Sequence, residues 1–386
     1  MSGALSGLRV IEMVGLGPAP FAAMMLADHG AEVIRIHAKG QRPDFPLLNG
    51  RFDVLGRNRR SLMIDLRAEG GADLLLDLVG QADGLIEGFR PGVMERLGLG
   101  PETCLARNPA LAYGRMTGWG QDGPMALQAG HDMNYLGLTG GLNAIGPADR
   151  PPIVPLNYVA DFGGGGMLLA FGLIAAILSA KRTGQGQVID AAMVDGASLL
   201  ASMFWGFRAG GAWSDRREAN LLDGGAYFYT TYACSDGRFL AVACVEKRFH
   251  DILLERLGLD PAVFTHVRDP SAWPGLRDRL AALLATQPRD HWAALFEGSD
   301  ACVSPVLGWD EAASHPQAVA REAFVSVEGV TQPAPAPRFT ATPARAPTTA
   351  VAPGRHSRAV LEDWGIDPAR VAAAFDSGMI AQGSDL

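Results

Sequence analysis

The fold is decided by residues 8–36, which read LRVIEMVGLGPAPFAAMMLADHGAEVIRI. The first six residues form an apolar run that predicts a buried strand. A loop of glycine and proline follows, and then an apolar segment that ends at Gly30, a residue type typical of the position just after a helix. Residues 31–36, AEVIRI, predict a second strand. Strand, helix and strand together predict the opening βαβ unit of a doubly wound α/β domain.

The same pattern continues along the chain. SLMIDL, DGLIEG and LAYGRM predict further strands at 61–66, 83–88 and 111–116, and GGADLLLDLVGQA predicts a crossover helix at 70–82. The first loop supplies two glycines of a dinucleotide-binding fingerprint, but Pro20 occupies the third position and the second strand continues into His37 rather than an acid. We therefore expect a Rossmann-like sheet without dinucleotide chemistry.

Changes in composition divide the chain into segments. Short alternating strands and helices after residue 224 predict a second, smaller α+β domain. The run from 332 to 354 contains six prolines and predicts extended chain that leads back to the first domain. The predicted segments are a large Rossmann-like domain at 1–200 and 330–386, a helical linker at 201–224, a small α+β domain at 225–318 and a return linker at 319–329.

The composition limits the class of protein. Charged residues make up 19% of the 386 residues and the formal net charge is −8, which is ordinary for a soluble enzyme and argues against a nucleic-acid partner. The four cysteines form no C-x-x-C and the histidines no H-E-x-x-H, so neither a disulfide framework nor a metal site is predicted. The opening MSGALSGLRVIEM lacks the regions of a secretory signal, so a cytoplasmic location is expected.

One segment raises the question of a membrane. GGGGMLLAFGLIAAILSA, at 163–180, is uncharged and 18 residues long, the lower limit for crossing a bilayer. It begins with glycines and stands alone among amphipathic segments. We therefore expect a helix buried in a soluble core and no membrane partner.

Four polar residues occur where either chemistry or local structure would explain them. His131 follows Gly130 and could simply start a helix, and Asp132 could cap the helix that begins with MNYLGL. Asp161 precedes four glycines and an apolar helix, which is also typical of a cap. Glu246 ends a predicted strand and could be a solvated loop residue. None of the four identifies a site by itself.

A set of arginines lies beside two predicted strands. GRNRRSL places Arg57, Arg59 and Arg60 just before one strand, and EGFRPGV places Arg90 just after another. Open α/β sheets bind ligands at the carboxyl ends of their strands, and the guanidinium group suits phosphate oxygens. A solvated basic loop is the alternative, and the pattern leaves both open.

These residues lie within longer text by which the chain resembles the family III CoA-transferases. The shared text includes GLGPAPFAAMMLADHGAEVIRI, EGFRPGVMERLGLGP, RMTGWGQDGP, AGHDMNYL, PLNYVADFGGGG, TGQGQVIDAAMVDG, LLDGGA and SDACVSPVL. It extends from about Leu5 to Val306 and, weakly, to PAPRF in the tail. Within the family, the chain is similar to the members that racemise 2-methylacyl-CoA thioesters.

The resemblance implies a Rossmann-like large domain, a small domain and an interlocked homodimer, with the proline-rich segment closing each chain into a ring. It implies an acyl-CoA substrate and no cofactor beyond the CoA moiety. The family's histidine of GHDxNY and aspartate of ADFGGG are an acid/base pair, here His131 and Asp161, with Glu246 supporting the histidine. Implied substrate and CoA contacts are Arg57, Arg59, Arg60, Arg90, Met63, Ile64, Asp65, Leu66, Gly130, Asp132, Met133, Asn134 and Tyr135.

Three departures from the family text border these residues. RIHAKGQRP has Ala38 where the racemases have a CoA-contacting arginine, so Lys39 or Arg42 is expected to substitute for it. Tyr227 replaces the usual proline after DGGA, and ACVEKRFH replaces GAIEPQFY. These changes leave the acid/base pair intact and leave the acyl chain undetermined.

The implied chemistry explains the residue types. Inversion at the carbon alpha to a thioester needs a base and an acid on opposite faces, and His131 and Asp161 can exchange these roles. The enolate oxygen needs preorganised donors, for which the N–H groups of the Gly130–Asp132 turn are candidates. The expected function is epimerisation at C2 of 2-methylacyl-CoA thioesters of fatty acids or sterol side chains. The alternative is a CoA-transferase with Asp161 as covalent nucleophile; because such relatives generally lack the histidine, His131 decides between the two.

Overall fold

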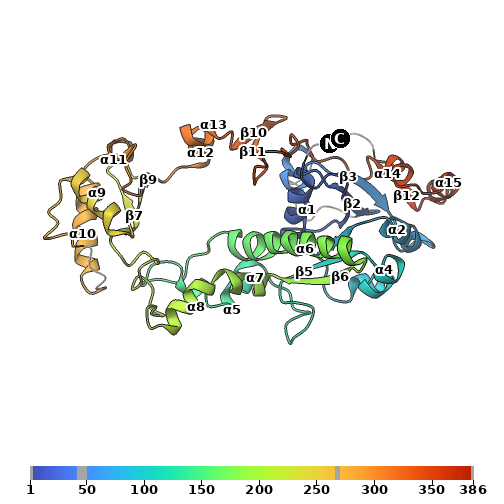
Figure 1. Cartoon of the computed structure of the whole chain (residues 1–386), viewed down its shortest axis with the longest axis horizontal. Coiled ribbons are helices and arrows are strands. Elements are labelled where there is room, and N and C mark those ends of the chain that lie inside the picture. The colour runs from blue at the N-terminus through green and yellow to red at the C-terminus, as the bar shows by residue number, and fades with distance from the viewer. Residues whose placement is uncertain (1–2, 41–49, 266–269, 384–386) are drawn as a thin grey trace. The chain divides into compact units, whose positions relative to one another are not determined.

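The computed structural model describes residues 3–40, 50–265 and 270–383, and the chain divides into two compact units (Figure 1). Unit 1 comprises Met1–Leu136, Leu156–Leu200 and Pro316–Leu386, and unit 2 comprises Gly137–Pro155 and Ala201–His315. Residues 137–155 cluster with unit 2 because Arg217 donates hydrogen bonds to the carbonyl oxygens of Asn143, Pro147 and Arg150, at 3.1, 2.9 and 2.7 Å.

Unit 1 is built on a seven-stranded sheet with the order β12-β3-β2-β1-β4-β5-β6. All its strand pairs are parallel except the antiparallel pair of β12 and β3. The five predicted strands are confirmed, whereas β6 and β12 were not predicted. The strands are β1 (Arg9–Met13), β2 (Glu32–Ala38), β3 (Arg60–Ile64), β4 (Gly84–Glu87), β5 (Ala112–Thr117), β6 (Gln187–Ala192) and β12 (Ile380–Ala381).

The strand order reverses at β1, which has β2 on one side and β4 on the other. In a doubly wound sheet, the connections after two such strands leave the carboxyl edge in opposite directions and open a crevice there. The β1–α1 loop with Gly17 and the segment after β4 with Arg90 both start from this edge. The topology therefore predicts that a ligand binds beside these two loops.

Helices cover both faces of the sheet (Figure 1). On one face, α2, α14 and α15 pack into a core that contains Ile11, Leu62, Tyr113 and Trp364, each fully buried. The C-terminal segment thus completes the core of the N-terminal sheet. The helices of unit 1 before residue 140 are α1 (Pro18–Asp28), α2 (Gly71–Val79), α3 (Val93–Arg96), α4 (Pro101–Arg107) and α5 (Asp132–Leu138), and the later ones are η4 (Tyr158–Met167), α6 (Leu168–Thr183), α7 (Met193–Leu200), α13 (Pro316–Ala320), α14 (Ser357–Asp363) and α15 (Pro368–Asp376).

The apolar segment forms a π-helix, η4, that continues into α6. One face of α6 packs on the sheet, where Leu173 contacts Gly84 of β4 and Leu169 lies over Gly114 of β5. Side chains larger than glycine at these strand positions would hold the helix away from the sheet. The prediction of a helix packed into the core is confirmed for this face.

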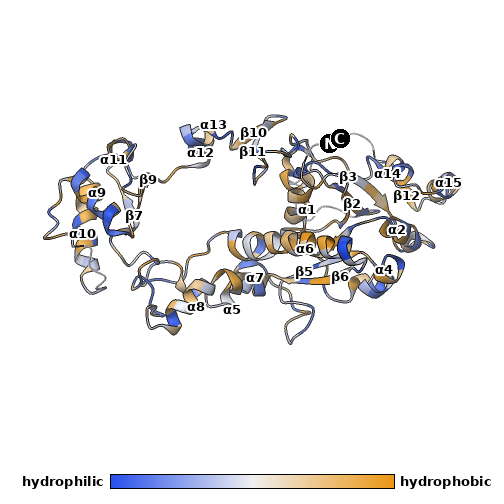
Figure 2. Ribbon diagram, in the orientation of Figure 1, coloured by the Kyte–Doolittle hydropathy of each residue, from blue (hydrophilic) through white to orange (hydrophobic). Residues whose placement is uncertain are grey.

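The opposite face of α6 is not covered within unit 1. Phe171 is 72% exposed and Leu178 57% exposed, and the apolar character of the helix is visible in Figure 2. By length and composition, Tyr158–Thr183 could cross a membrane: its 18-residue apolar window has a mean hydropathy of 1.9 and is 44% buried. The expectation of a fully buried helix was wrong for this face, because one sheet covers only one side of a helix that is apolar all round.

A β-hairpin of β10 (Phe324–Val327) and β11 (Val330–Pro333) begins in the predicted return linker at 319–329 and ends beyond it. Its two-residue turn is Glu328-Gly329, with φ values of 48° and 80°. Positive φ at both positions matches the twist of a tight hairpin. After β11, no helix or strand occurs from residue 334 to 356, which agrees with the proline-rich composition.

Unit 2 has an antiparallel sheet of β7 (Tyr229–Ala233), β8 (Phe239–Ala243) and β9 (Val303–Pro305). Its aromatic core includes Tyr227, Phe228 and Trp273. The antiparallel strands with helices agree with the α+β pattern expected from the sequence. The helices of unit 2 are η3 (Leu142–Ala144), α8 (Ser202–Ala209), α9 (Lys247–Leu257), α10 (Trp273–Leu284), α11 (Arg289–Phe296) and α12 (Trp309–Ser314).

Candidate active site

His131 lies in the turn that starts α5. Its backbone N–H donates to Asn134 Oδ1 at 3.0 Å, and its carbonyl oxygen accepts from the N–H groups of Asn134 and Tyr135 at 2.8 and 3.3 Å. The imidazole is exposed. The turn is therefore held by backbone atoms of His131, and its imidazole is available for other interactions.

Tyr135 supports this turn from beneath. A Cβ at Gly118 would lie 2.1 Å from the Tyr135 ring and one at Gly130 2.7 Å, so the ring fills space that only glycine leaves. The hydroxyl group donates to the carbonyl oxygen of Gly130, and the ring meets Trp119 edge to face at 4.8 Å. Burial raises the pKa of Tyr135 to about 12. Tyr135 and Gly130 thus shape the turn. Gly118 and Trp119 pack against the Tyr135 ring and also shape it, although the sequence analysis did not predict either as a site residue.

Asp132 is buried and does not cap its own helix. Its Oδ2 accepts from the backbone N–H groups of Ala160 and Asp161, both at 2.8 Å. These amides belong to the first turn of η4, so the expectation that Asp132 caps the following helix was wrong. The reason is spatial, since η4 begins beside α5 with unpaired N–H groups. The two neighbours Met133 and Asn134 are exposed.

Asp161 is half-buried on η4, at the carboxyl edge of the sheet. A Cβ on Gly17, in the loop after β1, would lie 3.7 Å from its Oδ2, and Asn157 Nδ2 donates to the same oxygen at 3.4 Å. Burial raises the pKa of Asp161 and the charge of Asp132 raises it further, while Asn157 and His131 lower it. Since Asp132 accepts from the backbone N–H of Asp161 at 2.8 Å, its chain neighbour His131 lies close to Asp161.

The glycines after Asp161 serve the packing of η4. A Cβ at Gly164 would lie 2.6 Å from the backbone nitrogen of Ala197 on α7, and one at Gly166 would lie 2.7 Å from the ring of Phe21 on α1. In the structure these glycines let η4 lie directly against two other helices, which fixes the backbone that carries Asp161.

Arg57 is engaged in a buried cluster. Its guanidinium donates to both carboxylate oxygens of Asp28, at 3.0 and 2.6 Å, and to Gln332 Oε1 and the carbonyl oxygen of Pro333, both at 2.8 Å. The guanidinium group of Arg57, predicted to contact CoA, is therefore already hydrogen-bonded to protein groups. In this structure Arg57 ties the start of the proline-rich segment to the end of α1.

Arg59 and Arg60 also have protein partners. Arg59 is buried and donates to Glu12 Oε2 at 2.6 Å, whereas Arg60 pairs with Glu32 at 2.8 Å and with Asp363 at 2.7 Å. Arg90 is exposed at the carboxyl edge and forms no ion pair with any residue in the described ranges. Arg90 is thus the member of the predicted set whose guanidinium remains open to a ligand.

The predicted contacts at the end of β3 meet the C-terminal segment. Ile64 is fully buried in the core and Leu66 packs against it. Met63 N–H donates to Ser357 Oγ at 3.2 Å, and Asp65 N–H to the carbonyl oxygen of Met379 at 2.8 Å. This strand end is therefore covered by the segment that follows the proline-rich run.

Of the two suggested substitutes for the family arginine, Lys39 donates to the carbonyl oxygen of Gly378 at 2.6 Å. Arg42 lies outside the described residues. Within the described ranges, no group of three His, Cys, Asp or Glu side chains gathers to hold a metal.

Glu246 belongs to unit 2, where it is exposed at the N-cap of α9. Its carbonyl oxygen accepts from the N–H groups of Phe249 and His250, both at 3.0 Å. His250 in turn contacts the hydroxyl group of Tyr227 within the core. Two residues that depart from the family text, Tyr227 and His250, are thus partners of each other.

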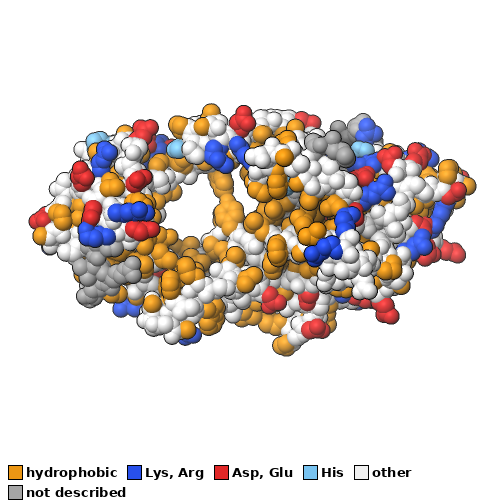
Figure 3. Space-filling model, in the orientation of Figure 1, with side chains coloured by type: hydrophobic (Ala, Val, Ile, Leu, Met, Phe, Trp, Pro, Cys, Tyr) orange, Lys and Arg blue, Asp and Glu red, His pale blue; other side chains and the backbone are white. Residues whose placement is uncertain are grey.

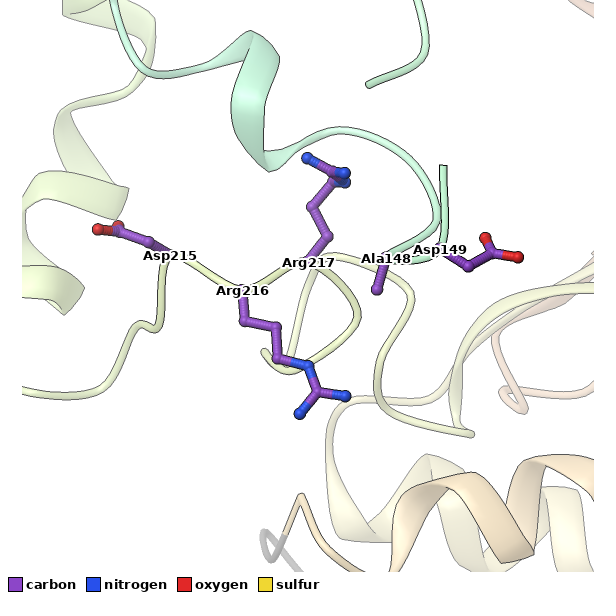
Figure 4. A pocket seen from close by; sticks show the side chains of 5 residues that line it. All are labelled: Ala148, Asp149, Asp215, Arg216 and Arg217. Atoms are coloured by element: carbon purple, nitrogen blue, oxygen red, sulfur yellow. The ribbon is translucent and has the colours of Figure 1, made fainter. Parts of the chain in front are cut away.

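Figure 4 shows a pocket of about 390 Å³ in unit 2, lined by Ala148, Asp149, Asp215, Arg216 and Arg217. The Arg217 side chain points into the neighbouring loop, where its hydrogen bonds hold residues 143–150. None of the predicted site residues lines this pocket. All five lining residues belong to unit 2.

Comparison with known proteins shows the family to which the chain belongs. Residues 5–357 match the model of CoA-transferase family III. The chain is 42% identical to the mouse and 43% to the human alpha-methylacyl-CoA racemase, in each case over 94% of this chain, and covers 93% and 94% of those proteins. A crystal structure of a CAIB/BAIF family protein from Brucella suis is 27% identical, with a TM-score of 0.80 over 94% of this chain and 100% of that one. The chain therefore belongs to family III of the CoA-transferases.

Proposed function

We propose that this protein epimerises C2 of 2-methylacyl-CoA thioesters by 1,1-proton transfer through an enolate. The observation that carries the proposal is that Asp132, the chain neighbour of His131, accepts a hydrogen bond from the backbone N–H of Asp161. The relatives at 42% and 43% identity are alpha-methylacyl-CoA racemases. The acyl chains we have in mind are those of fatty acids or sterol side chains. The absence of a cofactor beyond CoA and the cytoplasmic location remain predictions.

In the proposed reaction, one member of the pair removes the C2 proton and the electrons of the C–H bond move toward the thioester oxygen. The other member delivers its own proton to the opposite face, so that the pair keeps one proton in total and nothing is oxidised or reduced. The reverse reaction exchanges the two roles. Glu246 is proposed to support His131, and Arg90 is proposed to contact the CoA phosphates.

The enolate oxygen is proposed to accept from a backbone N–H of the turn before α5. The N–H of His131 is already donated to Asn134 Oδ1, so the N–H of Asp132 is the better candidate. Removing one donor of this type from known oxyanion holes costs about 2.7–4 kcal/mol of transition-state stabilisation.

The test is to incubate a single C2 epimer with the enzyme in D₂O and no acceptor carboxylate. We expect both epimers with deuterium at C2, because the returned proton comes from a group that exchanges with solvent. The alternative, a CoA-transferase with Asp161 as nucleophile, predicts no exchange, a requirement for an acceptor carboxylate and capture of an enzyme-bound intermediate by hydroxylamine. Saturable CoA binding with neither reaction would contradict both functions.

We also propose that two copies of the chain associate as an interlocked homodimer. The support is the uncovered face of α6, where Phe171, Ile174 and Leu178 are 72%, 37% and 57% exposed. Apolar side chains are visible on the molecular surface over this helix (Figure 3). Contiguous apolar surface of this kind marks an interaction site. Light scattering is expected to give twice the chain mass of 40.7 kDa, and a mass of 40.7 kDa would contradict the proposal.

A further inference from the structure

The carboxylate of Asp132 connects the two residues of the site. Asp132 follows His131 directly in the chain, and its Oδ2 accepts from the N–H groups of Ala160 and Asp161, 28 and 29 residues later, both at 2.8 Å. The Asp132 carboxylate is thus hydrogen-bonded to the backbone of Asp161, and it belongs to the residue that directly follows His131.

The first turn of η4 needs this acceptor. Its own N-cap residue, Asn157, makes no side-chain hydrogen bond to the helix amides and instead donates to Asp161 Oδ2. Unpaired N–H groups at a helix start are satisfied by an acidic side chain, which also interacts favourably with the helix dipole. Without Asp132, two buried N–H groups would lose their acceptor and η4 would be free to shift relative to His131.

The charge of Asp132 acts on the same pair. Asp132 Oδ1 is buried and has no hydrogen-bond donor among the described residues. The groups that interact electrostatically with Asp161 are Asp132, His131 and Tyr135. From α1 and α7, which also pack on η4, the contacts among the described residues come from Pro18, Phe21, Met193, Gly196, Ala197 and Leu200, none of which titrates.

We propose that Asp132 is a positioning residue for the proton transfer, holding His131 and Asp161 at a fixed separation and keeping the proton shared between them. The inference rests on the proposed epimerase function. Each direction of the reaction needs one member protonated and the other not. A negative charge beside Asp161 favours its protonated form and so brings its proton affinity closer to that of an imidazole. The pair can then start with the proton on Asp161 or with the proton on His131, as the two directions of the reaction require.

The test compares Asp132→Asn with Asp367→Asn. Asparagine keeps an oxygen acceptor for the two N–H groups and removes the charge. With the neighbouring charge gone, ionised Asp161 is favoured and its pKa falls, so the acidic limb of the kcat–pH profile should move to lower pH. KM should remain within about twofold of the wild type, since no substrate contact is removed. Asp367 is an exposed N-cap of α15 that accepts from Ala369 and Arg370, so its variant should leave the profile in place.

Titration of Asp161 by carboxyl ¹³C NMR, assigned with Asp161→Asn, provides a readout that does not depend on turnover. A lowered pKa of Asp161 in Asp132→Asn supports the inference even if the wild type fails to exchange deuterium. An unchanged pKa and an unchanged pH profile in Asp132→Asn would overturn it. Asp132→Ser, a second neutral cap, serves if the asparagine variant does not fold.

Discussion

Replacing His131 by glutamine is expected to slow deuterium exchange at C2 by about 10²- to 10⁴-fold, the usual contribution of a positioned acid/base group. Glutamine can form hydrogen bonds but cannot take up or deliver the proton. The turn before α5 should survive, because Asn134 and Tyr135 bond to backbone atoms of residue 131 rather than to the imidazole. The measurement is ¹H NMR of a 2-methylacyl-CoA thioester in D₂O, with CD spectra to check the fold.

The matched control is His291→Gln, which makes the same chemical change at an exposed histidine of α11 in unit 2. Its exchange rate should equal that of the wild type. If His131→Gln also exchanged at the wild-type rate, the histidine would have no part in the proton transfer. If it instead retained acyl transfer to a carboxylate and hydroxylamine captured an intermediate, the transferase alternative would be supported.

Glu12→Gln is expected to lower the free energy of unfolding of unit 1 by about 3–5 kcal/mol. This is the usual cost of leaving one charge of a buried ion pair without its partner. The side chains of Glu12 and Arg59 are both 0% exposed and lie 2.6 Å apart. Burial raises the pKa of Glu12 and lowers that of Arg59 to about 10, so each charge depends on the other. Without the carboxylate, Arg59 would remain buried beside Arg35, a second cation.

Urea unfolding followed by hydrogen exchange of the β1 to β3 amides would report on this unit alone. The control is Glu32→Gln, which removes the partner of Arg60 in a pair whose side chains are 31% and 26% exposed. Because solvent screens that pair, its loss should cost at most about 1 kcal/mol. Equal effects of the two variants would contradict the assignment of Arg59 as a buried structural arginine.

Much of unit 1 could be predicted from local patterns. Apolar runs bounded by glycine and proline predicted the strands β1 to β5, because a strand buried on both faces of a parallel sheet is apolar throughout. β6 was not predicted, since QVIDAA places an acid within a short run that continues directly into a helix. β12 has only two residues, too few for any pattern.

The residue types of the site could also be predicted, because His131 and Asp161 lie within the sequence motifs AGHDMNYL and PLNYVADFGGGG. What the local text could not give was the partner of each charged group. The sequence around Arg57 and Arg59 is typical of a phosphate-binding cluster. In the structure, these arginines pair with Asp28 and Glu12, which lie 29 and 47 residues away in the chain. Asp132 looks like the cap of its own helix, yet it caps η4.

By itself, the sequence determined the class of the sheet, the family and the two residue types that the proposed proton transfer needs. Only the tertiary structure decided which arginine stays open to a ligand, which face of α6 stays exposed and which helix Asp132 caps. The physical reason is that hydrophobic periodicity is a property of neighbours along the chain. The state of a buried charge depends instead on which groups the fold brings within a few ångströms of it, and those groups come from distant positions.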